Sequence, residues 1–196
     1  MSKTYYHFTT WQIGSELVGQ QCKTDWEVSN YWQGRLDGSF LVDDDPFETM
    51  PTELSNVLKA MQIEEVLRPL LLHLKYSSQL LKEYIFEEVR ASEFPQIPSR
   101  KRCMFLFEAE QAEDAEAYFQ KMGFELRGRS LIKVEPIEDN SVTHRTDAKL
   151  LDANLSKQPE IATAARKYWQ GTNQPVELPE VLLEGWFVIR EVIKIY

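Results

Sequence analysis

Two successive segments near residue 196 look like β-strands, and this constrains the fold more than any other feature of the sequence. The segments are residues 177–185 (ELPEVLLEG) and 186–196 (WFVIREVIKIY). Charged residues alternate with apolar ones in the second segment, which is typical of a strand with one face in water. The sequence therefore predicts two strands here and a sheet that contains them.

Other segments predict a mixture of strands and helices. Strands are expected at residues 4–9 (TYYHFT), at Cys103–Phe107 and at 130–137 (SLIKVEPI), because β-branched and aromatic residues dominate them. Helices are expected where apolar residues recur at helical spacing and a glycine follows the last turn. These helices are 109–125, which ends near Gly123, and 159–170, which Gly171 closes.

The middle of the chain predicts a helical insertion, residues 52–90. Two helices are expected, 52–67 and 69–90, with Pro69 in the first turn of the second, where its missing N–H is not needed. An apolar stripe follows the second helix, and we expect it to face the core rather than a partner. The stripe is formed by Leu71, Leu74, Leu81, Ile85 and Val89.

Two long segments predict loops. Residues 12–50 are expected to be mostly loop with a short helix, and a loop of this length is usually functional or disordered. Its aromatic residues favour an ordered segment. Residues 139–156 are expected to form a polar loop around Asp147 and Asp152.

Length and composition restrict the class of protein. A chain of 196 residues suits one domain, and its net charge of −9 argues against broad, nonspecific binding to nucleic-acid phosphates. Cys22 and Cys103 are the only cysteines and no metal-binding spacing occurs, so we expect a reducing compartment and no metal site. Because there is neither a long apolar run nor a signal-peptide pattern, the sequence predicts a cytoplasmic protein without membrane contact.

Three features that could take part in catalysis or binding follow one another along the chain. His7 lies within YHFT on the first strand, an aromatic strand at Cys103–Phe107 leads into the helical EDAEAYF, and Glu180 opens PEVLLEGWFVIREV. In this order they resemble the ADP-ribosyltransferase superfamily, in the branch whose signature is histidine, an aromatic residue and glutamate. Residues 86–102 (FEEVRASEFPQIPSRKR) further resemble an uncharacterised, toxin-like bacterial offshoot of that superfamily.

The resemblance spans residues 4–193. It implies an α+β fold with a split mixed or antiparallel β-sheet core, in a single ADP-ribosyltransferase-like domain over residues 1–196 that carries the helical insertion 52–90. It also implies that NAD is the substrate. No GxGxxG occurs, which argues against a Rossmann-type NAD site, but this superfamily does not use one.

The resemblance assigns roles around the ribose. Cleavage of the nicotinamide–ribose bond develops positive charge on the sugar, as in glycoside hydrolysis, and a nearby carboxylate stabilises it. Glu180 is the candidate carboxylate, with Glu177 and Glu184 as alternatives because sequence does not fix the strand register. His7 is expected to position a ribose hydroxyl, which is orientation rather than proton transfer, and Thr9 to assist it.

The resemblance also assigns roles around the nicotinamide and the pyrophosphate. Phe105, or Tyr118 on the following helix, is expected to stack on the nicotinamide ring, and a phenylalanine here departs from the family's usual tyrosine. Arg100, with Ser99, is expected to bind the pyrophosphate, because a guanidinium matches phosphate oxygens in bidentate fashion. Arg90 and Arg102 either assist in this or form an ordinary ion pair and a solvated turn.

Three functions remain open from the sequence. The first is transfer of ADP-ribose to a protein or to single-stranded nucleic acid, as a bacterial toxin with an antitoxin partner or as a phage-defence effector. The second is a catalytically degenerate module that binds a partner, and the third is NAD hydrolysis. Aromatic residues beside basic ones in the long loop suit base stacking, which favours a nucleic-acid acceptor. They are Trp26, Tyr31 and Trp32, with Lys23 and Arg35.

Overall fold

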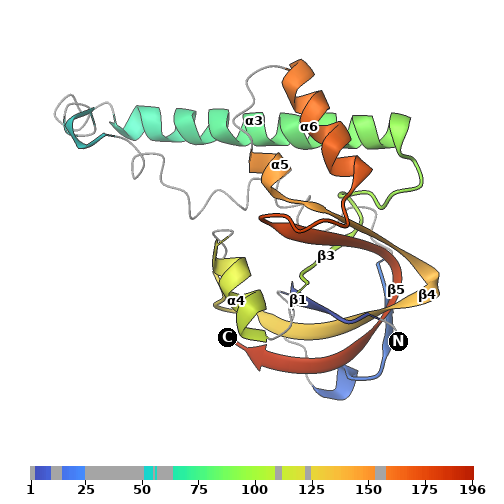
Figure 1. Cartoon of the computed structure of the whole chain (residues 1–196). Coiled ribbons are helices and arrows are strands. Elements are labelled where there is room, and N and C mark those ends of the chain that lie inside the picture. The colour runs from blue at the N-terminus through green and yellow to red at the C-terminus, as the bar shows by residue number, and fades with distance from the viewer. Residues whose placement is uncertain are drawn as a thin grey trace.

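The protein is a mixed α+β structure in which a strongly curved antiparallel sheet carries helices on its outer side (Figure 1). The computed structural model describes residues 3–9, 15–24, 51–54, 56, 64–108, 112–121, 125–152 and 158–196. The described strands are β1 (Tyr5–Thr9), β2 (Gln21–Lys23), β3 (Met104–Leu106), β4 (Ser130–Asp147) and β5 (Pro179–Ile195). The described helices are η1 (Ser15–Leu17), α3 (Glu64–Glu93), α4 (Ala112–Lys121), α5 (Lys149–Asp152) and α6 (Gln158–Gln170).

The long strands β4 and β5 run through two halves of the sheet. The strand order is β1-β4-β5-β2, and β3 pairs with β5 beside this path. In the first half, the β3 half-sheet, β5 up to Glu184 pairs with β3 and with the end of β4. In the second, the β1 half-sheet, β5 from Trp186 pairs with β2 and with the start of β4, which also pairs with β1.

Gly185 makes the bend between the two halves possible. Its φ of 121° is a conformation that residues with a side chain rarely adopt. It pairs with Ser141, where the register of β4 shifts, and a Cβ atom at position 185 would lie only 2.3 Å from the carbonyl oxygen of Asn140. The bend therefore needs a glycine for two separate reasons.

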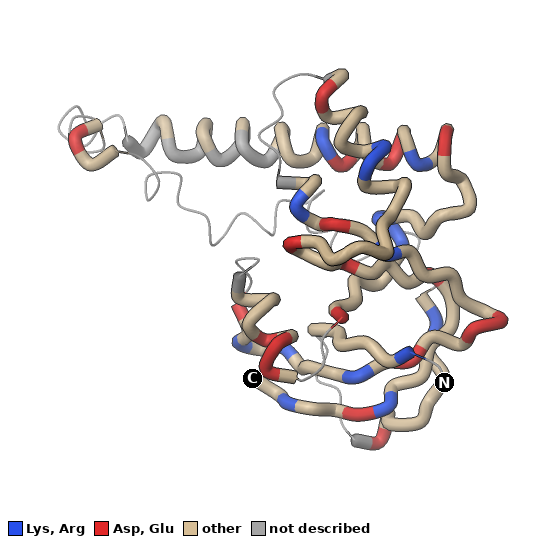
Figure 2. The backbone as a smooth tube through the Cα atoms, in the orientation of Figure 1, with Lys and Arg blue, Asp and Glu red and all other residues tan. Residues whose placement is uncertain are grey.

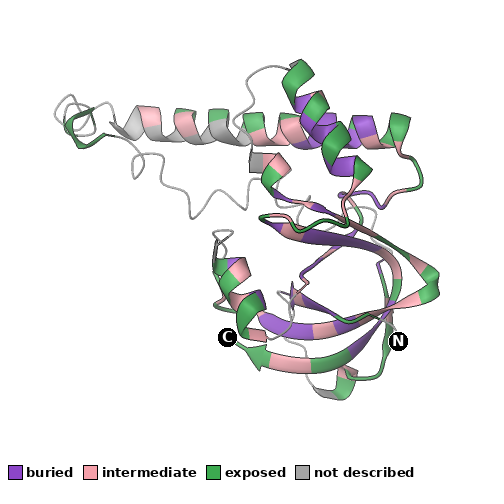
Figure 3. Ribbon diagram, in the orientation of Figure 1, coloured by how far each residue is buried: buried purple, intermediate pink, exposed green. Residues whose placement is uncertain are grey.

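Three hydrophobic clusters hold these layers together (Figure 3). The inner cluster fills the concave side of the sheet, the α3–α6 cluster packs these helices on the β3 half-sheet, and the α4 cluster packs α4 against β1. In the α3–α6 cluster, Trp169 of α6 donates a hydrogen bond to the Phe86 carbonyl of α3. In the α4 cluster, Phe8 stacks on Phe119. The inner cluster contains Tyr5, Met104, Leu106, Ile132, Val134, Val181, Leu183, Phe187 and Ile189.

The α+β class and several elements predicted from the sequence are confirmed. Strands form within 4–9 and 103–107, and α6 ends at Gln170, directly before Gly171, whose φ is 69°. The polar loop expected at 139–156 is wrong over residues 139–152, because β4 continues to Asp147 and α5 follows, and the rest of it lies outside the described residues. Its residues are polar because they form a solvent-exposed part of a strand. The two C-terminal strands are one strand, bent at Gly185.

The prediction for the second helix of the insertion is wrong in its start and in its stripe. The helix runs unbroken from Glu64, so Pro69 lies beyond its first turn. Of the stripe, Ile85 and Val89 are buried, whereas Leu74 and Leu81 are exposed. The reason is that α6 covers only the C-terminal part of α3 (Figure 1).

Other expectations fall outside the described residues. They concern Gly123 and the aromatic residues between 25 and 50, including Trp26, Tyr31 and Trp32, together with Arg35. Among the residues that are described, no helix combines the length and apolarity needed to cross a membrane.

Candidate functional site

A cluster of buried polar and charged side chains lies between α3, α6 and β5, and its centre is Arg100. This residue follows α3 in the turn that leads to β3, and only 2% of it is exposed. Its Nε and Nη2 atoms donate to the two carboxylate oxygens of Glu83 on α3, at 3.0 and 3.2 Å. Its Nη1 atom donates to Oε1 of Glu180 on β5 at 2.8 Å. One buried guanidinium therefore joins two carboxylates from distant segments.

Tyr168 of α6 completes this arrangement, which we call the Arg100 network (Glu83, Arg100, Tyr168 and Glu180). Its hydroxyl accepts a hydrogen bond from Arg100 and donates one to Oε1 of Glu180. Burial raises the pKa of Tyr168 well above its usual value, so the phenol keeps the proton that it donates. The Arg100 guanidinium also lies 4.9 Å from the centre of the Phe105 ring. The network thus fixes Oε1 of Glu180 from two sides.

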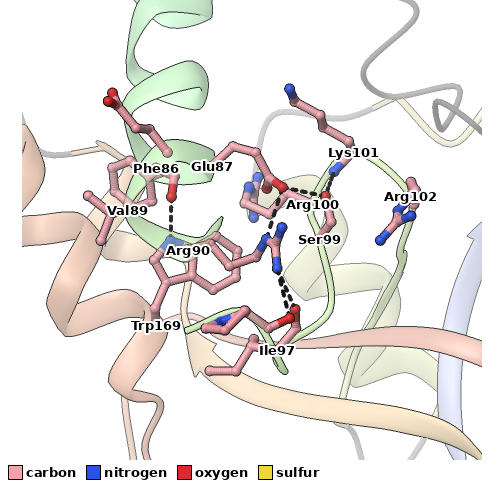
Figure 4. A network of polar contacts seen from close by, with 12 residues as sticks. Phe86, Glu87, Val89, Arg90, Ile97, Ser99, Arg100, Lys101, Arg102 and Trp169 are labelled. Carbon is pink, nitrogen blue, oxygen red and sulfur yellow. Dashed lines mark hydrogen bonds and ion pairs between the residues drawn. The ribbon is translucent and has the colours of Figure 1, made fainter. Parts of the chain in front are cut away.

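A second set of contacts surrounds Ser99 (Figure 4). The Ser99 hydroxyl donates to Oε1 of Glu87 at 2.7 Å, and Nε of Arg90 donates to the same oxygen at 2.9 Å. The backbone N–H of Ser99 donates to Oε2 of Glu184 at 3.1 Å. Burial raises the pKa of the neighbouring Cys103 thiol well above its usual value, so this thiol stays protonated and is a poor nucleophile.

His7 is held by the backbone of the neighbouring strand. Its Nδ1 atom lies 2.8 Å from the carbonyl oxygen of Phe105, and because a carbonyl only accepts, Nδ1 carries the proton. Burial is the largest cause that lowers the pKa of His7, to about 4. The ring is therefore neutral at pH 7, and its Nε2 atom is an acceptor suited to a hydroxyl group.

The junction of β1 and β3 lies beside His7, and two backbone hydrogen bonds between Tyr6 and Phe107 close it. β1 meets β3 at the isolated bridge between Tyr6 and Phe107, and one residue further along β1 the His7 ring binds the Phe105 carbonyl. His7 lies on the face of β1 that carries Tyr5 of the inner cluster. Glu180 instead faces α3 and α6, so the two side chains leave the sheet on opposite faces.

The remaining predicted residues are separated from one another. Phe105 touches both regions, through its carbonyl oxygen at His7 and through its ring at Arg100. Tyr118 lies on α4 with its ring 5.0 Å from that of Phe107, and Thr9 is buried at the end of β1 opposite Ser130.

The three candidate glutamates have different surroundings. Glu177 is exposed and lies 3.5 Å from Nζ of Lys149. Glu184 is partly exposed and pairs with Arg102 at 3.1 Å. Glu180 is the buried one, with 8% of the residue exposed. The register of β5 therefore gives only Glu180 a fixed carboxylate supported by two buried donors.

Sequence reasoning missed Glu83, Glu87 and Tyr168. The glutamates lie four positions apart on α3, directly beside the buried Phe86, and both are buried. Charged residues on the apolar side of an amphipathic helix are a signal that a buried partner exists. That signal is present in the sequence, although it does not reveal that the partners are Arg100, Ser99 and Arg90.

Replacement of His7 by asparagine tests the state of its ring. Asparagine places an N–H near Nδ1 but does not titrate. The pKa of His7 is about 4 in the folded protein against 6.5 normally, so the unfolded chain binds more protons between these values. Stability is therefore fully present above about pH 6.5 and falls as pH drops towards 4, by at most about 3 kcal/mol.

Denaturant unfolding at pH 7 and pH 4.5 measures this effect. The wild type is expected to lose more stability between the two pH values than His7→Asn, and His144, which is present in both proteins, cancels in the comparison. Equal losses in the two proteins would mean that the pKa of His7 is not lowered in the folded protein.

Comparison with known proteins adds a family without a known activity. The family described as "Protein of unknown function (DUF2441)" matches residues 5–195. No curated protein matches the chain. Within the described residues, no group of three or more histidine, cysteine, aspartate or glutamate side chains is placed to hold a metal ion.

Proposed function

The chain belongs to this family of unknown function, and from the chemistry of its own residues we propose that it is an ADP-ribosyltransferase that uses NAD as its substrate. The observation that carries the proposal is the carboxylate of Glu180. Oε1 of this carboxylate is fixed by Arg100 and Tyr168, whereas no described residue donates a hydrogen bond to Oε2. An anion with one oxygen held and one oxygen open suits a developing positive charge on a ribose ring.

The junction of β1 and β3 supplies the second part of the proposal. A ligand at the edge between two strands can contact side chains from both faces of a sheet, which a ligand lying on one face cannot. At this edge the neutral His7 offers Nε2 as an acceptor for a ribose hydroxyl. The Arg100 guanidinium lies 4.9 Å from the centre of the Phe105 ring, and we assign this ring to stack on nicotinamide.

Arg100 has a changed role in this proposal. It was expected to bind the pyrophosphate, but its guanidinium is closed off from solvent and binds two carboxylates. We assign it the task of holding Glu180 in place. Ser99 is closed off in the same way, since its hydroxyl and N–H bind Glu87 and Glu184.

Labelled NAD tests the reaction. The purified protein is incubated with NAD labelled in the adenylate part and a bacterial lysate, and both transferred label and free nicotinamide are measured. Transferred label supports the transferase, and nicotinamide release without transfer means that water is the acceptor and the protein is an NAD hydrolase. If a folded protein gives neither, the enzymatic proposal fails.

A catalytically inactive binding module is the second candidate. The structure offers one argument for such a module. The guanidinium of Arg100 already binds two carboxylates, which a pyrophosphate would have to displace. Thermal unfolding with and without NAD separates the candidates. NAD at about 100 times its dissociation constant would stabilise a binding protein by about 2.7 kcal/mol, and an unchanged melting temperature at millimolar NAD favours the module.

A further inference from the structure

A pocket of about 510 Å³ is lined by Glu184, the carboxylate that accepts a hydrogen bond from the Ser99 N–H. Its volume falls in the usual range for small ligands, about 300–1,000 Å³. The lining comes from the end of β2, the loop after α3, and the bend of β4 and β5. The polar or charged side chains in it are Lys23, Thr24, Arg90, Gln96, Arg102 and Glu184.

The walls of the pocket are fixed by hydrogen bonds. On one side, Thr24 and Gly185 are joined by reciprocal bonds, with the Thr24 N–H on the Gly185 carbonyl at 2.9 Å and the Gly185 N–H on the Thr24 hydroxyl at 2.8 Å. On the other side, Nη1 of Arg90 donates to the carbonyl oxygens of Pro95 and Ile97 (Figure 4). The pocket is therefore built into the fold.

The charges that line the pocket favour an anion. Three cations and one carboxylate line it, in a protein whose net charge is −9 and whose lysines and arginines are otherwise scattered among acidic residues (Figure 2). Arg90 is paired with Glu87 through its Nε atom at 2.9 Å, but its Nη2 atom has no hydrogen-bond partner among the described residues. Lys23 has no ion pair among those residues, and its ammonium contacts only the Trp186 ring. Arg102 is paired with Glu184, but half of its side chain is exposed, and an exposed pair of this kind is weak enough to open.

An aromatic ring lies next to these cations. Trp186 pairs with Lys23 across β2 and β5, and Nζ of Lys23 lies 5.8 Å from the centre of the indole ring. Trp186 is 38% exposed, which is unusual for so large an apolar side chain. Cations that contact phosphates beside an exposed aromatic ring that stacks on bases are the usual elements of a single-strand binding site.

We propose that this pocket binds a phosphate group together with an adjoining base that stacks on Trp186, as in a nucleotide or a single-stranded nucleic acid. Lys23 and Arg102 contact the phosphate, and Arg90 donates to it through Nη2. This binding does not depend on NAD chemistry. Only the use of the pocket to hold the nucleic-acid acceptor of an ADP-ribose transfer rests on the proposed function.

Fluorescence anisotropy with a fluorescein-labelled ten-nucleotide oligothymidylate tests the pocket in the absence of NAD. We expect saturable binding that weakens as salt is raised, because bound phosphates release counterions. Lys23→Glu and Arg102→Glu are each expected to weaken binding about tenfold or more, and Trp186→Ala to weaken it about tenfold through lost stacking. Lys167→Glu, a charge reversal at an exposed position of α6 outside the pocket, is the matched control and is expected to bind like the wild type.

Competition by unlabelled AMP identifies the source of the phosphate. Competition by AMP at concentrations similar to those of the oligonucleotide assigns the pocket to free nucleotides, and binding of the oligonucleotide alone assigns it to a strand. Either result supports the proposal. Absence of saturable binding by both, or binding that Lys23→Glu and Arg102→Glu leave unchanged in folded protein, overturns it whatever the NAD assay gives.

Discussion

Replacing Arg100 with methionine is expected to lower the free energy of unfolding by about 3–5 kcal/mol. The variant keeps much of the side-chain volume but leaves Glu83 and Glu180 as buried carboxylates without their shared cation. The loss of one partner from a buried ion pair costs more than the pair itself contributes, because the remaining charge is neither hydrated nor paired. Urea unfolding followed by circular dichroism measures the difference.

An exposed ion pair between α3 and α6 offers a matched control for this substitution. Arg166→Met removes the ion pair of Arg166 with Glu93, whose side chains are 48% and 39% exposed, and is expected to change stability by less than about 1 kcal/mol. Adding Glu83→Gln and Glu180→Gln to the Arg100 variant removes the unpaired charges and is expected to restore part of the stability. An Arg100 variant as stable as the Arg166 variant would contradict the buried network.

The second large effect is expected on catalysis. Glu180→Gln is expected to lower nicotinamide release from NAD by at least about 100-fold. Glutamine still accepts hydrogen bonds from Arg100 and Tyr168 at Oε1, so the side chain stays in place. What it loses is the negative charge that, in the proposed reaction, stabilises an oxocarbenium-like sugar. The rate is measured with saturating NAD and with protein whose melting temperature has been checked.

Two other glutamates on the same segment serve as controls. Glu177→Gln removes a charge from an exposed position and is expected to leave the rate unchanged. Glu184→Gln tests the alternative carboxylate, which lines the neighbouring pocket. If Glu184→Gln abolishes the reaction while Glu180→Gln retains it, the assignment of the carboxylate is wrong although the reaction is right.

Sequence reasoning succeeded where structure is decided locally. The first strand and α6 follow from side-chain periodicity and, for α6, from a closing glycine. It failed at residues 139–147, where a solvent-exposed strand has the composition of a loop, and in the stripe on α3, where burial depends on where α6 crosses. Periodicity shows which residues share a face, but not how much of that face another element covers.

The candidate site could be predicted only in part for the same reason. His7, Phe105 and Glu180 stand out as residue types in a certain order, but the partners of Arg100 come from positions 17, 68 and 80 residues away. No local pattern encodes such distances. The expectation that Arg100 binds a phosphate was reasonable for an arginine in a turn, and two buried carboxylates occupy it instead.

The position of β5 in the sheet has a consequence for how the protein acquires its structure during synthesis. This strand pairs with β2, β3 and β4, and it supplies Glu180, yet it is the last strand along the sequence. Earlier strands and the Glu83–Arg100 pair cannot reach their final surroundings until residues 179–195 have left the ribosome. The nascent chain therefore keeps apolar strand edges and an incomplete ion cluster uncovered until that stretch has emerged, and uncovered strand edges promote aggregation.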